Sequence, residues 1–548
     1  MKIEYTEQIV RQLTYSDGQS EIRPLSKADE PLVFKSQILD NVHGFISYTE
    51  AEHKIMNTLL FKRLQSIKQL SVVNWVFPGS EHTRYIHSLG VMHVADKMAM
   101  SMRLSNRERR ILRMAGLLHD IGHYPLSHVG EHPYQVDETA EREVDNAVDF
   151  CELVNEEVVK NIKNFSIRKP FELMSCSDDF HHEAVGAAIV KNNKEIRKIV
   201  EDELGEGAAE IIADIITGNV EREVKDPMKR TDPLWVQIMH SELDADGIDY
   251  IMRDSASAGT SFGACEIEQL IRCLRVGKLE DGTRIMCIKP KGIPAADQYL
   301  INKFFHYSQV VFNRHIVICE MMAMKVIGWM LHHNRRFPGV DTLQEWMDKG
   351  GTDGFLEFTD DMFWRALAEL KDDPSVPDHI QLFSKYLLRH EEPVVAKPQE
   401  IRIVSHVGRT DKDESEIAER IRDRLKNSET YQFSDRRREW LTSLEIRRMS
   451  KQLPKDLFDK AVKKNFEEYC KKGSRTKTKD KLAEYAKAER LRKMECICVR
   501  EHIEYDEKGE EKPHVIRVLC DDDRSIMRDI YDKTLVILRS YEYPKPKK

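Results

Sequence analysis

The stretch Gly116-Leu-Leu-His-Asp-Ile-Gly-His123 ends an apolar helical run with an imidazole beside a carboxylate, and a further imidazole follows four residues after the first. Upstream, Ser105-Asn-Arg-Glu108 is a capping-box pattern, in which the Ser and Glu side chains satisfy free backbone N–H groups and so predict the start of a helix. Apolar residues then recur at helical spacing up to Leu118. Packing alone rarely requires a His-Asp pair, so we interpret this one as half of a metal site.

Composition describes a soluble globular chain. It has 548 residues, of which 41% are hydrophobic and 32% charged, and two or three lobes are expected at this length. The net charge of −8 argues against a general nucleic-acid binder. No apolar run approaches the roughly 20 residues of a membrane helix, and no secretion signal is evident. Ten scattered cysteines without a CxxC pair predict a reduced, cytoplasmic protein.

The sequence predicts a mainly α fold: an all-helical core with small β-hairpins, followed by a smaller α+β lobe. Residues 1–49 read as a lead-in with short strands, residues 50–390 as the main helical domain, and residues 391–548 as the charged C-terminal lobe. An acidic helical insertion is expected at about residues 129–180. Further predicted helices span about residues 84–102, 105–118, 234–253, 295–331 and 525–538, and predicted hairpins lie at 274–288 and 496–520.

Histidines and acids follow one another along the main domain as an ordered series. His87 comes first, His119-Asp120 follows about thirty residues later, and His182-Glu183 and a run of aspartates from Asp244 to Asp254 come after them. Imidazole nitrogens and carboxylate oxygens together suit a divalent ion such as Mg, Mn, Fe, Ni or Zn. Two imidazoles and two carboxylates leave coordination positions open, which is typical of a catalytic metal.

This order resembles the HD superfamily of metal-dependent phosphohydrolases. The fuller pattern is similar to its deoxynucleoside triphosphate (dNTP) triphosphohydrolase branch, which includes the animal enzyme with a sterile-alpha-motif domain and bacterial dNTPases. The matching pieces cover roughly residues 50–330 and are Thr83–Val91, Leu117–His128, His182-Glu183 and Asp244–Asp254.

The resemblance implies a role for each matching residue. It implies that the metal is bound by His87, His119, Asp120 and Asp246. It implies substrate contacts from Arg84, His128, Tyr250, Asp254 and Lys303, and catalytic roles for His123, His182, Glu183 and Glu131. Among these, His182 is the candidate acid for the leaving group, oriented by Glu183 or Glu131. The implied reaction is attack of water at the α-phosphorus, which gives deoxynucleoside and triphosphate.

Other interpretations stay open at this point. A phosphohydrolase acting on nucleoside monophosphates or oligonucleotides is the enzymatic alternative, and a nucleotide-sensing regulator is the alternative from another class. The chain departs from the family at Gly247, where Lys is common, and at Val311, where Tyr is common, so the base and sugar are undetermined. Asp249 and Arg253 are expected to form a surface ion pair. A nucleotide effector and a homo-oligomer are expected from the resemblance, and no membrane is expected. Nucleic-acid contact is possible but not indicated.

Overall fold

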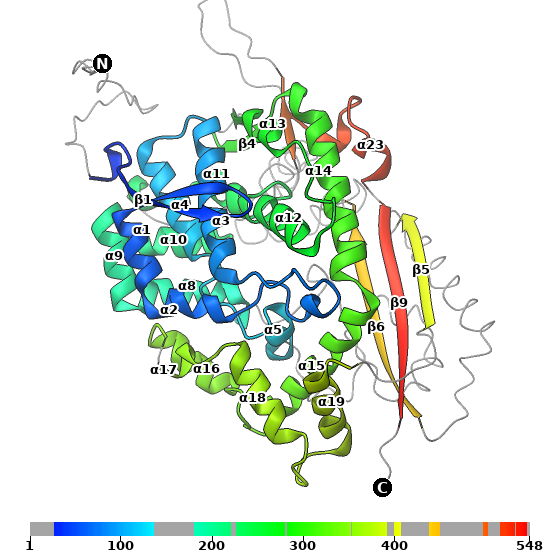
Figure 1. Cartoon of the computed structure of the whole chain (residues 1–548). Helices are drawn as coiled ribbons and strands as arrows, with labels where there is room; N and C mark the ends of the chain where they lie inside the picture. Colours follow the sequence, from blue (N-terminus) through cyan, green and yellow to red (C-terminus); the bar gives the residue numbers. More distant parts are fainter. Residues whose placement is uncertain are drawn as a thin grey trace, which may run out of the picture.

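Helices build most of the structure around the stretch from Gly116 to His123 (Figure 1). The computed structural model describes residues 27–135, 180–220, 226–279, 282–351, 353–391, 399–406, 438–449, 497–501, 516–531 and 533–544. Its α-helices are α1 (Glu50–Asn57), α2 (Leu59–Lys62), α3 (Arg84–Ser101), α4 (Asn106–Leu118), α5 (His128–Gln135), α8 (His182–Asn192), α9 (Lys194–Leu204), α10 (Ala208–Ile216), α11 (Pro233–Met239), α12 (Ala245–Ala258), α13 (Ile267–Arg272), α14 (Ile293–His306), α15 (Arg314–His332), α16 (Val340–Asp348), α17 (Asp353–Leu356), α18 (Asp360–Leu370), α19 (Asp378–Arg389) and α23 (Met527–Ile530).

Three small sheets accompany the helices. The strands are β1 (Phe34–Asp40), β2 (Gly44–Thr49), β3 (Leu274–Lys278), β4 (Arg284–Ile288), β5 (Gln399–His406), β6 (Arg438–Arg448), β7 (Cys498–Arg500), β8 (Ile516–Val518) and β9 (Lys533–Pro544). β1 and β2 form an antiparallel hairpin with Ile38 opposite Ile46. The other sheets have the orders β3-β4-β7-β8 and β5-β9-β6. The mainly α prediction is therefore confirmed.

The helix that carries the His-Asp pair begins where the sequence predicts. The Ser105 side chain accepts from the Glu108 backbone N–H and the Glu108 carboxylate accepts from the Ser105 backbone N–H, so the capping box is formed. The helix α4 packs against α3, which in turn packs against α12. Arg113 of α4 is buried and ties three elements together, because its guanidinium contacts Glu52 of α1 at 2.6 Å and Asp96 of α3 at 2.9 Å.

Two predicted long helices are each interrupted. The prediction over 234–253 is wrong in the middle, because α11 ends at Met239 and α12 begins at Ala245 after the N-cap Asp244. The Asp244 carboxylate accepts from the Gly247 backbone N–H at 2.7 Å, and this cap starts a new helix. The run over 295–331 is broken by a π-helical turn at Tyr307–Val311, after which Asn313 caps α15.

The end of the chain contradicts a further prediction. A helix over 525–538 is wrong beyond Ile530, because residues 533–544 form β9 at the centre of a three-stranded sheet. Leu535 and Ile537 are both buried in a small core with Phe304 and Phe312. They are two residues apart, which is the spacing of side chains on one face of a strand. Most of the predicted insertion, residues 136–179, lies outside the described residues.

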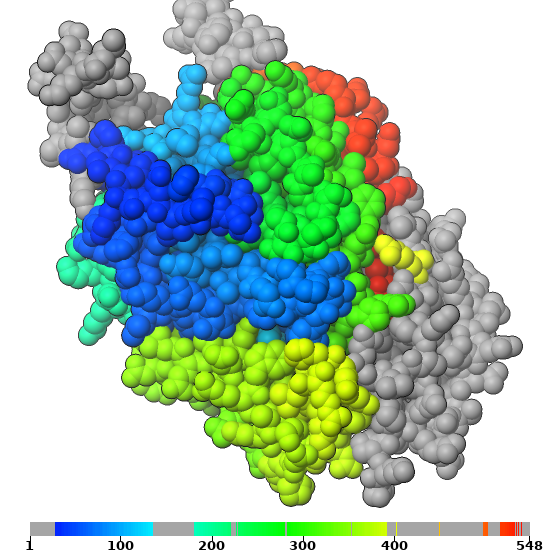
Figure 2. All heavy atoms as spheres, viewed as in Figure 1, coloured from blue at the N-terminus to red at the C-terminus, as the bar shows by residue number. Residues whose placement is uncertain are grey.

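Strands from the predicted C-terminal lobe join the main domain. β7 and β8 pair antiparallel, which confirms the hairpin predicted at 496–520, and β7 pairs in parallel with β4. Figure 2 shows α16 to α19, in yellow-green, as a layer against the blue and cyan helices. The helix α15 is long and apolar enough to cross a membrane. However, 72% of its most apolar stretch is buried inside the fold, and this burial accounts for its apolar composition.

Candidate functional site

The four predicted metal ligands come from three helix ends that meet in the core. His87 lies in the first turn of α3, His119 and Asp120 follow the last turn of α4, and Asp246 lies in the first turn of α12. His87, His119 and Asp120 are buried, whereas the Asp246 side chain is 37% exposed. Residues that are 159 positions apart in the sequence are thus brought into contact.

Distances between the ligand atoms suit a single divalent cation. His87 Nε2 lies 2.9 Å from Asp246 Oδ1 and 3.7 Å from Asp120 Oδ2. His119 Nε2 lies 3.4 Å from Asp120 Oδ1 and 3.8 Å from Asp246 Oδ1. His119 Nε2 is buried and has no hydrogen bond among the described residues, so its lone pair is available to a cation. With metal–ligand bonds of about 2.1 Å, donor atoms on one ion lie about 3–4 Å apart, so His87, His119 and Asp246 fit a metal, with Asp120 next to them.

The other nitrogen of each imidazole is held by a second group, as is usual for histidines that bind metals. His119 Nδ1 lies 2.8 Å from the Gly116 carbonyl oxygen, and His87 Nδ1 lies 2.7 Å from Asp249 Oδ2. Asp249 also receives Arg253 Nε at 2.9 Å, so the predicted ion pair exists. Both residues are fully buried rather than on the surface, because Asp249 must reach His87. Sequence reasoning missed this role, although Asp249 lies one turn after Asp246.

Nearby cations keep the carboxylates ionised. Burial alone would raise the pKa of Asp120, but the Arg84 guanidinium and the neighbouring imidazoles hold it well below its usual range. Arg84 Nη1 donates to Asp120 Oδ2 at 2.9 Å, and Arg84 Nε donates to the Ser127 hydroxyl at 2.9 Å. Burial alone would raise the pKa of Asp246, but its hydrogen bond with His87 and the charges of His87 and His119 together lower it. Anionic carboxylates are the form that binds a cation.

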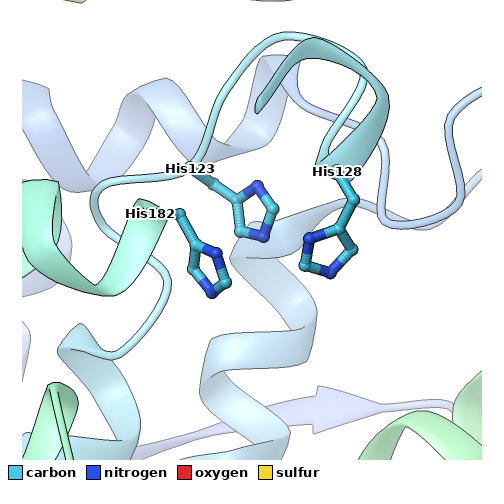
Figure 3. Close-up of side chains that lie close together, drawn as sticks. All are labelled: His123, His128 and His182. Carbon is cyan, nitrogen blue, oxygen red and sulfur yellow. The ribbon is translucent and has the colours of Figure 1, made fainter. Parts of the chain in front are cut away.

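A second group of three imidazoles, His123, His128 and His182, gathers in one place (Figure 3). His123 Nε2 is 3.8 Å and His182 Nε2 is 3.9 Å from Asp120 Oδ1. The rings of His123 and His182 stack with centroids 4.2 Å apart. Gly122 allows this contact, because a Cβ there would lie 2.2 Å from the His182 carbonyl oxygen. The helix α8 can therefore start directly against the loop that follows α4.

The fully buried Glu131 orients two of these histidines. Its carboxylate lies 2.9 Å from His128 Nδ1 and 3.2 Å from His182 Nδ1, and it accepts from the His182 backbone N–H at 2.9 Å. Glu183 Oε2 also lies 3.3 Å from His182 Nδ1. Burial alone would lower the pKa of His182, but Glu183 and Glu131 raise it to about 9. His182 can therefore carry a proton at neutral pH.

His123 is arranged as a donor. The Tyr124 backbone N–H donates to His123 Nδ1 at 3.3 Å, which assigns the proton of a neutral ring to Nε2. Burial, followed by the positive charge of Arg84, lowers the pKa of His123 well below its usual value, so the ring stays neutral. Its Nε2 is buried without a hydrogen-bond partner among the described residues. This N–H is therefore ready to donate to an oxygen of a bound molecule.

Lys303 and Tyr250 extend the site along α12. Lys303 is buried, and its ammonium group lies 5.5 Å from the centre of the Tyr250 ring and 3.4 Å from the Glu242 carbonyl oxygen. Gly247 makes room for it, since a Cβ there would lie 2.5 Å from the Tyr299 hydroxyl and 3.2 Å from the Lys303 ammonium. Where the family commonly has Lys, this chain has Gly247, and the cation at this place is Lys303 of α14.

Asp254 is buried between two histidines that sequence reasoning missed. His82 Nε2 lies 2.8 Å from Asp254 Oδ1, and His306 Nε2 lies 3.2 Å from Asp254 Oδ2. Burial alone would raise the pKa of Asp254, but these hydrogen bonds lower it to about 2. No sequence signal links these residues, because His82 precedes α3 and His306 ends α14. Asp254 is therefore fixed in place before any substrate contact.

Comparison with known proteins finds a family match over the part of the chain that includes His87, His119 and Asp120. The HD domain family model matches residues 84–165. An uncharacterised protein of Methanocaldococcus jannaschii, MJ1154, is 26% identical over 290 residues, which are 53% of this chain and 49% of that protein. The human deoxynucleoside triphosphate triphosphohydrolase SAMHD1 is 38% identical over 99 residues, which are 17% of this chain and 16% of that enzyme. The chain thus spans about half, or less, of the length of these curated relatives.

Solved structures share the fold over nearly the whole chain. A hypothetical protein from Aquifex aeolicus superposes with a TM-score of 0.55 at 18% identity, covering 92% of this chain and 96% of that one. A phosphohydrolase from Bacteroides thetaiotaomicron superposes with a TM-score of 0.53 at 17% identity, covering 92% and 99%. At this identity the likeness establishes the fold alone.

Proposed function

Because the chain carries an HD domain and resembles the dNTP triphosphohydrolase branch of the HD superfamily, we propose that it hydrolyses dNTPs to deoxynucleoside and triphosphate. The coarser assignment, an HD-type phosphohydrolase, follows from the domain match. One observation supports a hydrolase most: Asp120, one of the four proposed ligands, lies 3.8 Å from His123 Nε2 and 3.9 Å from His182 Nε2. That arrangement combines charge neutralisation with a proton donor, as phosphate ester hydrolysis requires.

The proposed metal ligands are His87, His119, Asp120 and Asp246. When bound there, a divalent cation supplies Lewis acidity, which neutralises phosphate oxygens and lowers the pKa of water. The donor set of imidazoles and carboxylates suits Mg, Mn, Fe, Ni or Zn. Asp249 supports the set by fixing the ring of His87.

His182 is the proposed general acid for the leaving 5′ oxygen. Its Nδ1 is held by Glu131, so its Nε2 faces the side of the site where Asp120 lies. Of the two carboxylates predicted to orient it, Glu131 is the better supported, because it is fully buried and also holds the His182 backbone N–H. Glu183 is 30% exposed and contributes mainly charge.

Arg84, Lys303 and His123 are the proposed phosphate contacts. Arg84 is buried with its guanidinium against Asp120, and Lys303 is buried beside Tyr250 of α12. His123 Nε2–H is a neutral donor 3.8 Å from Asp120 Oδ1. Such groups stabilise the negative charge that spreads over the phosphate oxygens as the bond breaks.

A substrate panel tests this proposal. Purified protein is incubated with each dNTP, with NTPs, and with dNTP mixtures in the presence of each candidate metal, because an activator can differ from the substrate. We expect metal-dependent consumption of dNTPs, and we expect Asp120→Ala to lose both bound metal and turnover while Asp341→Ala, an exposed carboxylate on α16, retains them. Turnover of monophosphates or oligonucleotides but not dNTPs would instead support the enzymatic alternative, and nucleotide binding without turnover would support a sensor.

A further inference from the structure

A histidine outside the helices that carry the proposed ligands reaches the metal centre from the hairpin β1-β2. His43 lies in the turn of this hairpin, and its Nε2 is 2.6 Å from Asp249 Oδ1, across 206 positions of sequence. The other oxygen of the same carboxylate lies 2.7 Å from His87 Nδ1. The His43 side chain is 5% exposed and the His87 side chain is fully buried. A continuous line of contacts therefore joins the hairpin turn to a proposed metal ligand.

The Asp249 carboxylate is held on both of its oxygens. Arg253 Nε donates to Oδ2 at 2.9 Å and Arg253 Nη2 donates to Oδ1 at 3.0 Å. This two-pronged pair keeps the carboxylate ionised and able only to accept, so His43 donates from Nε2. Gly90 of α3 leaves room for the pair, because a Cβ there would lie 1.9 Å from Asp249 Oδ1 and 2.5 Å from Arg253 Nη2. Each oxygen thus has one histidine and one arginine nitrogen, and His43 is the partner that comes from the hairpin.

The turn that carries His43 is shaped by Asp40. One oxygen of its carboxylate accepts from the backbone N–H groups of Val42 and His43, at 2.9 and 2.8 Å, which closes the turn. The other oxygen accepts from Arg253 Nη1 at 2.8 Å. Arg253 therefore binds both the turn that presents His43 and the carboxylate that His43 contacts.

The rest of the hairpin lies across α3 and α4 (Figure 1). The Ser47 carbonyl oxygen of β2 accepts from Arg113 of α4 at 2.7 Å, and Ile46 is buried. Leu39 and Phe45, which pair across the two strands, are exposed on the outer side. A two-stranded hairpin is marginally stable by itself, so the position of its turn depends on the contacts with Asp249 and α12.

We propose that His43 is a positioning residue of the metal site: docking of the β1-β2 turn onto Asp249 orients the His87 ring and so raises the affinity for a divalent cation. A group that holds the free nitrogen of a metal-bound histidine typically changes metal affinity about 10- to 100-fold when it is removed. His43 acts one contact further out, and Asp249 keeps Arg253 without it, so a smaller effect of about three- to tenfold is expected. The inference rests on the proposed ligand set and not on the substrate.

Calorimetric titration with Mn²⁺ of the full chain, freed of metal by a chelator, tests the proposal. His43→Ala is expected to weaken Mn²⁺ binding about three- to tenfold. In His43→Gln the amide nitrogen can still donate to Asp249 Oδ1, so its affinity should stay within about twofold of the parent. His53→Ala is the matched control and should leave the affinity unchanged. His53 contacts Lys35 of β1 at 3.1 Å and stacks on Tyr48 of β2, at the end of the hairpin away from the turn.

The outcomes separate this proposal from the ligand set on which it rests. Equal Mn²⁺ affinity in His43→Ala and the parent would overturn the role of His43 and leave the ligand set standing. Equal weakening by His53→Ala and His43→Ala would overturn it as well, because general loosening of the hairpin would then explain both. A parent chain that binds no Mn²⁺ would overturn the ligand set itself, and this proposal with it.

Hydrogen exchange of the unmodified chain keeps the test informative if His43→Ala does not fold. By linkage, a cation that binds more tightly when the turn is docked must also stabilise docking. Mn²⁺ is therefore expected to slow amide exchange in the turn, residues 40–44, where the Val42 and His43 N–H groups bond Asp40. Asp120→Ala should abolish this slowing. Slower exchange in α3 and α12 without any change at residues 40–44 would overturn the proposal.

Discussion

Glu131 is the residue on which the proposed proton transfer depends most. It is fully buried, and its carboxylate holds the rings of His128 and His182 as well as the His182 backbone N–H. Burial alone would raise its pKa, but the surrounding histidines lower it well below the usual value, so it stays anionic. An anionic, buried carboxylate both fixes the His182 ring and favours its protonated form.

Replacing Glu131 by Gln is therefore expected to reduce kcat about 100-fold or more, the usual contribution of a positioned general acid. Bound metal, measured by elemental analysis, should remain, because Glu131 is not a proposed ligand. Glu183→Gln is the matched control, since that carboxylate is partly exposed, and it should reduce kcat much less. A larger effect from Glu183→Gln than from Glu131→Gln would reverse the two assignments.

Residues that are close in sequence were predictable, and those brought together by folding were not. His119, Asp120 and His123 lie within five residues of one another, so their closeness follows from the sequence, although they lie in the turn after α4 and not on one helix face as i,i+4 spacing predicts. The i,i+4 spacing of Asp249 and Arg253 predicts their ion pair, which exists. The spacing does not tell which face of the helix is buried, so the sequence places the pair on the surface. His82 and His306 could not be found at all, since their shared contact with Asp254 exists only in the folded chain.

At the scale of elements, Arg113 joins α1, α3 and α4 through a buried ion network with Glu52 and Asp96. Removing the cation would leave the buried Glu52 carboxylate without a cation, whereas Asp96 would keep its ion pair with Arg109 at 2.7 Å. Arg113→Leu is therefore expected to lower the free energy of unfolding by about 3–5 kcal/mol. Urea denaturation measures this. Arg336→Leu removes an exposed ion pair and should cost less than about 1 kcal/mol, so similar losses in both variants would contradict the network's importance.

His93 makes the stability of α3 depend on pH. Burial, followed by the charges of His43, Lys97 and Arg113, lowers its pKa to about 4. Between about pH 6.5 and 4 the unfolded chain binds a proton at His93 that the folded chain does not. This contribution to stability is therefore lost as the pH falls through that window, by up to about 3 kcal/mol. His93→Gln should flatten the decline in urea-measured stability between pH 6.5 and 4. The exposed His379→Gln serves as the control, and an unchanged slope in His93→Gln would contradict the assignment.

Helix starts were easier to predict than helix breaks. The capping box at Ser105 is a local signal, and α4 begins there. The break before α12 depends on Asp244 capping a new axis, and the π-helical turn at Tyr307–Val311 interrupts an apolar run that reads as continuous helix. Both breaks lie next to residues of the site, one before Asp246 and one after Lys303. At these two places the local sequence pattern favours a continuous helix, whereas the folded structure has a break.

At the scale of the molecule, the separate C-terminal lobe from residue 391 stays a prediction, and the sequence gives no sign of how its strands join the rest. The composition changes near residue 391, yet β7 pairs with β4 and β9 packs on α14, so the C-terminal strands complete the main domain. Parallel pairing across more than 200 residues leaves no local signal. Cytoplasmic location, homo-oligomerisation and a nucleotide effector stay predictions from the sequence.

Hydrolysis of a dNTP in ¹⁸O-labelled water, with products separated by anion exchange and analysed by mass spectrometry, tests the central claim most directly. If water attacks the α-phosphorus and the bond to the 5′ oxygen breaks, the deoxynucleoside leaves unlabelled and the inorganic triphosphate carries one ¹⁸O. Label in a deoxynucleoside monophosphate released with pyrophosphate, or in single phosphate released with a diphosphate, would contradict the proposed triphosphohydrolase reaction.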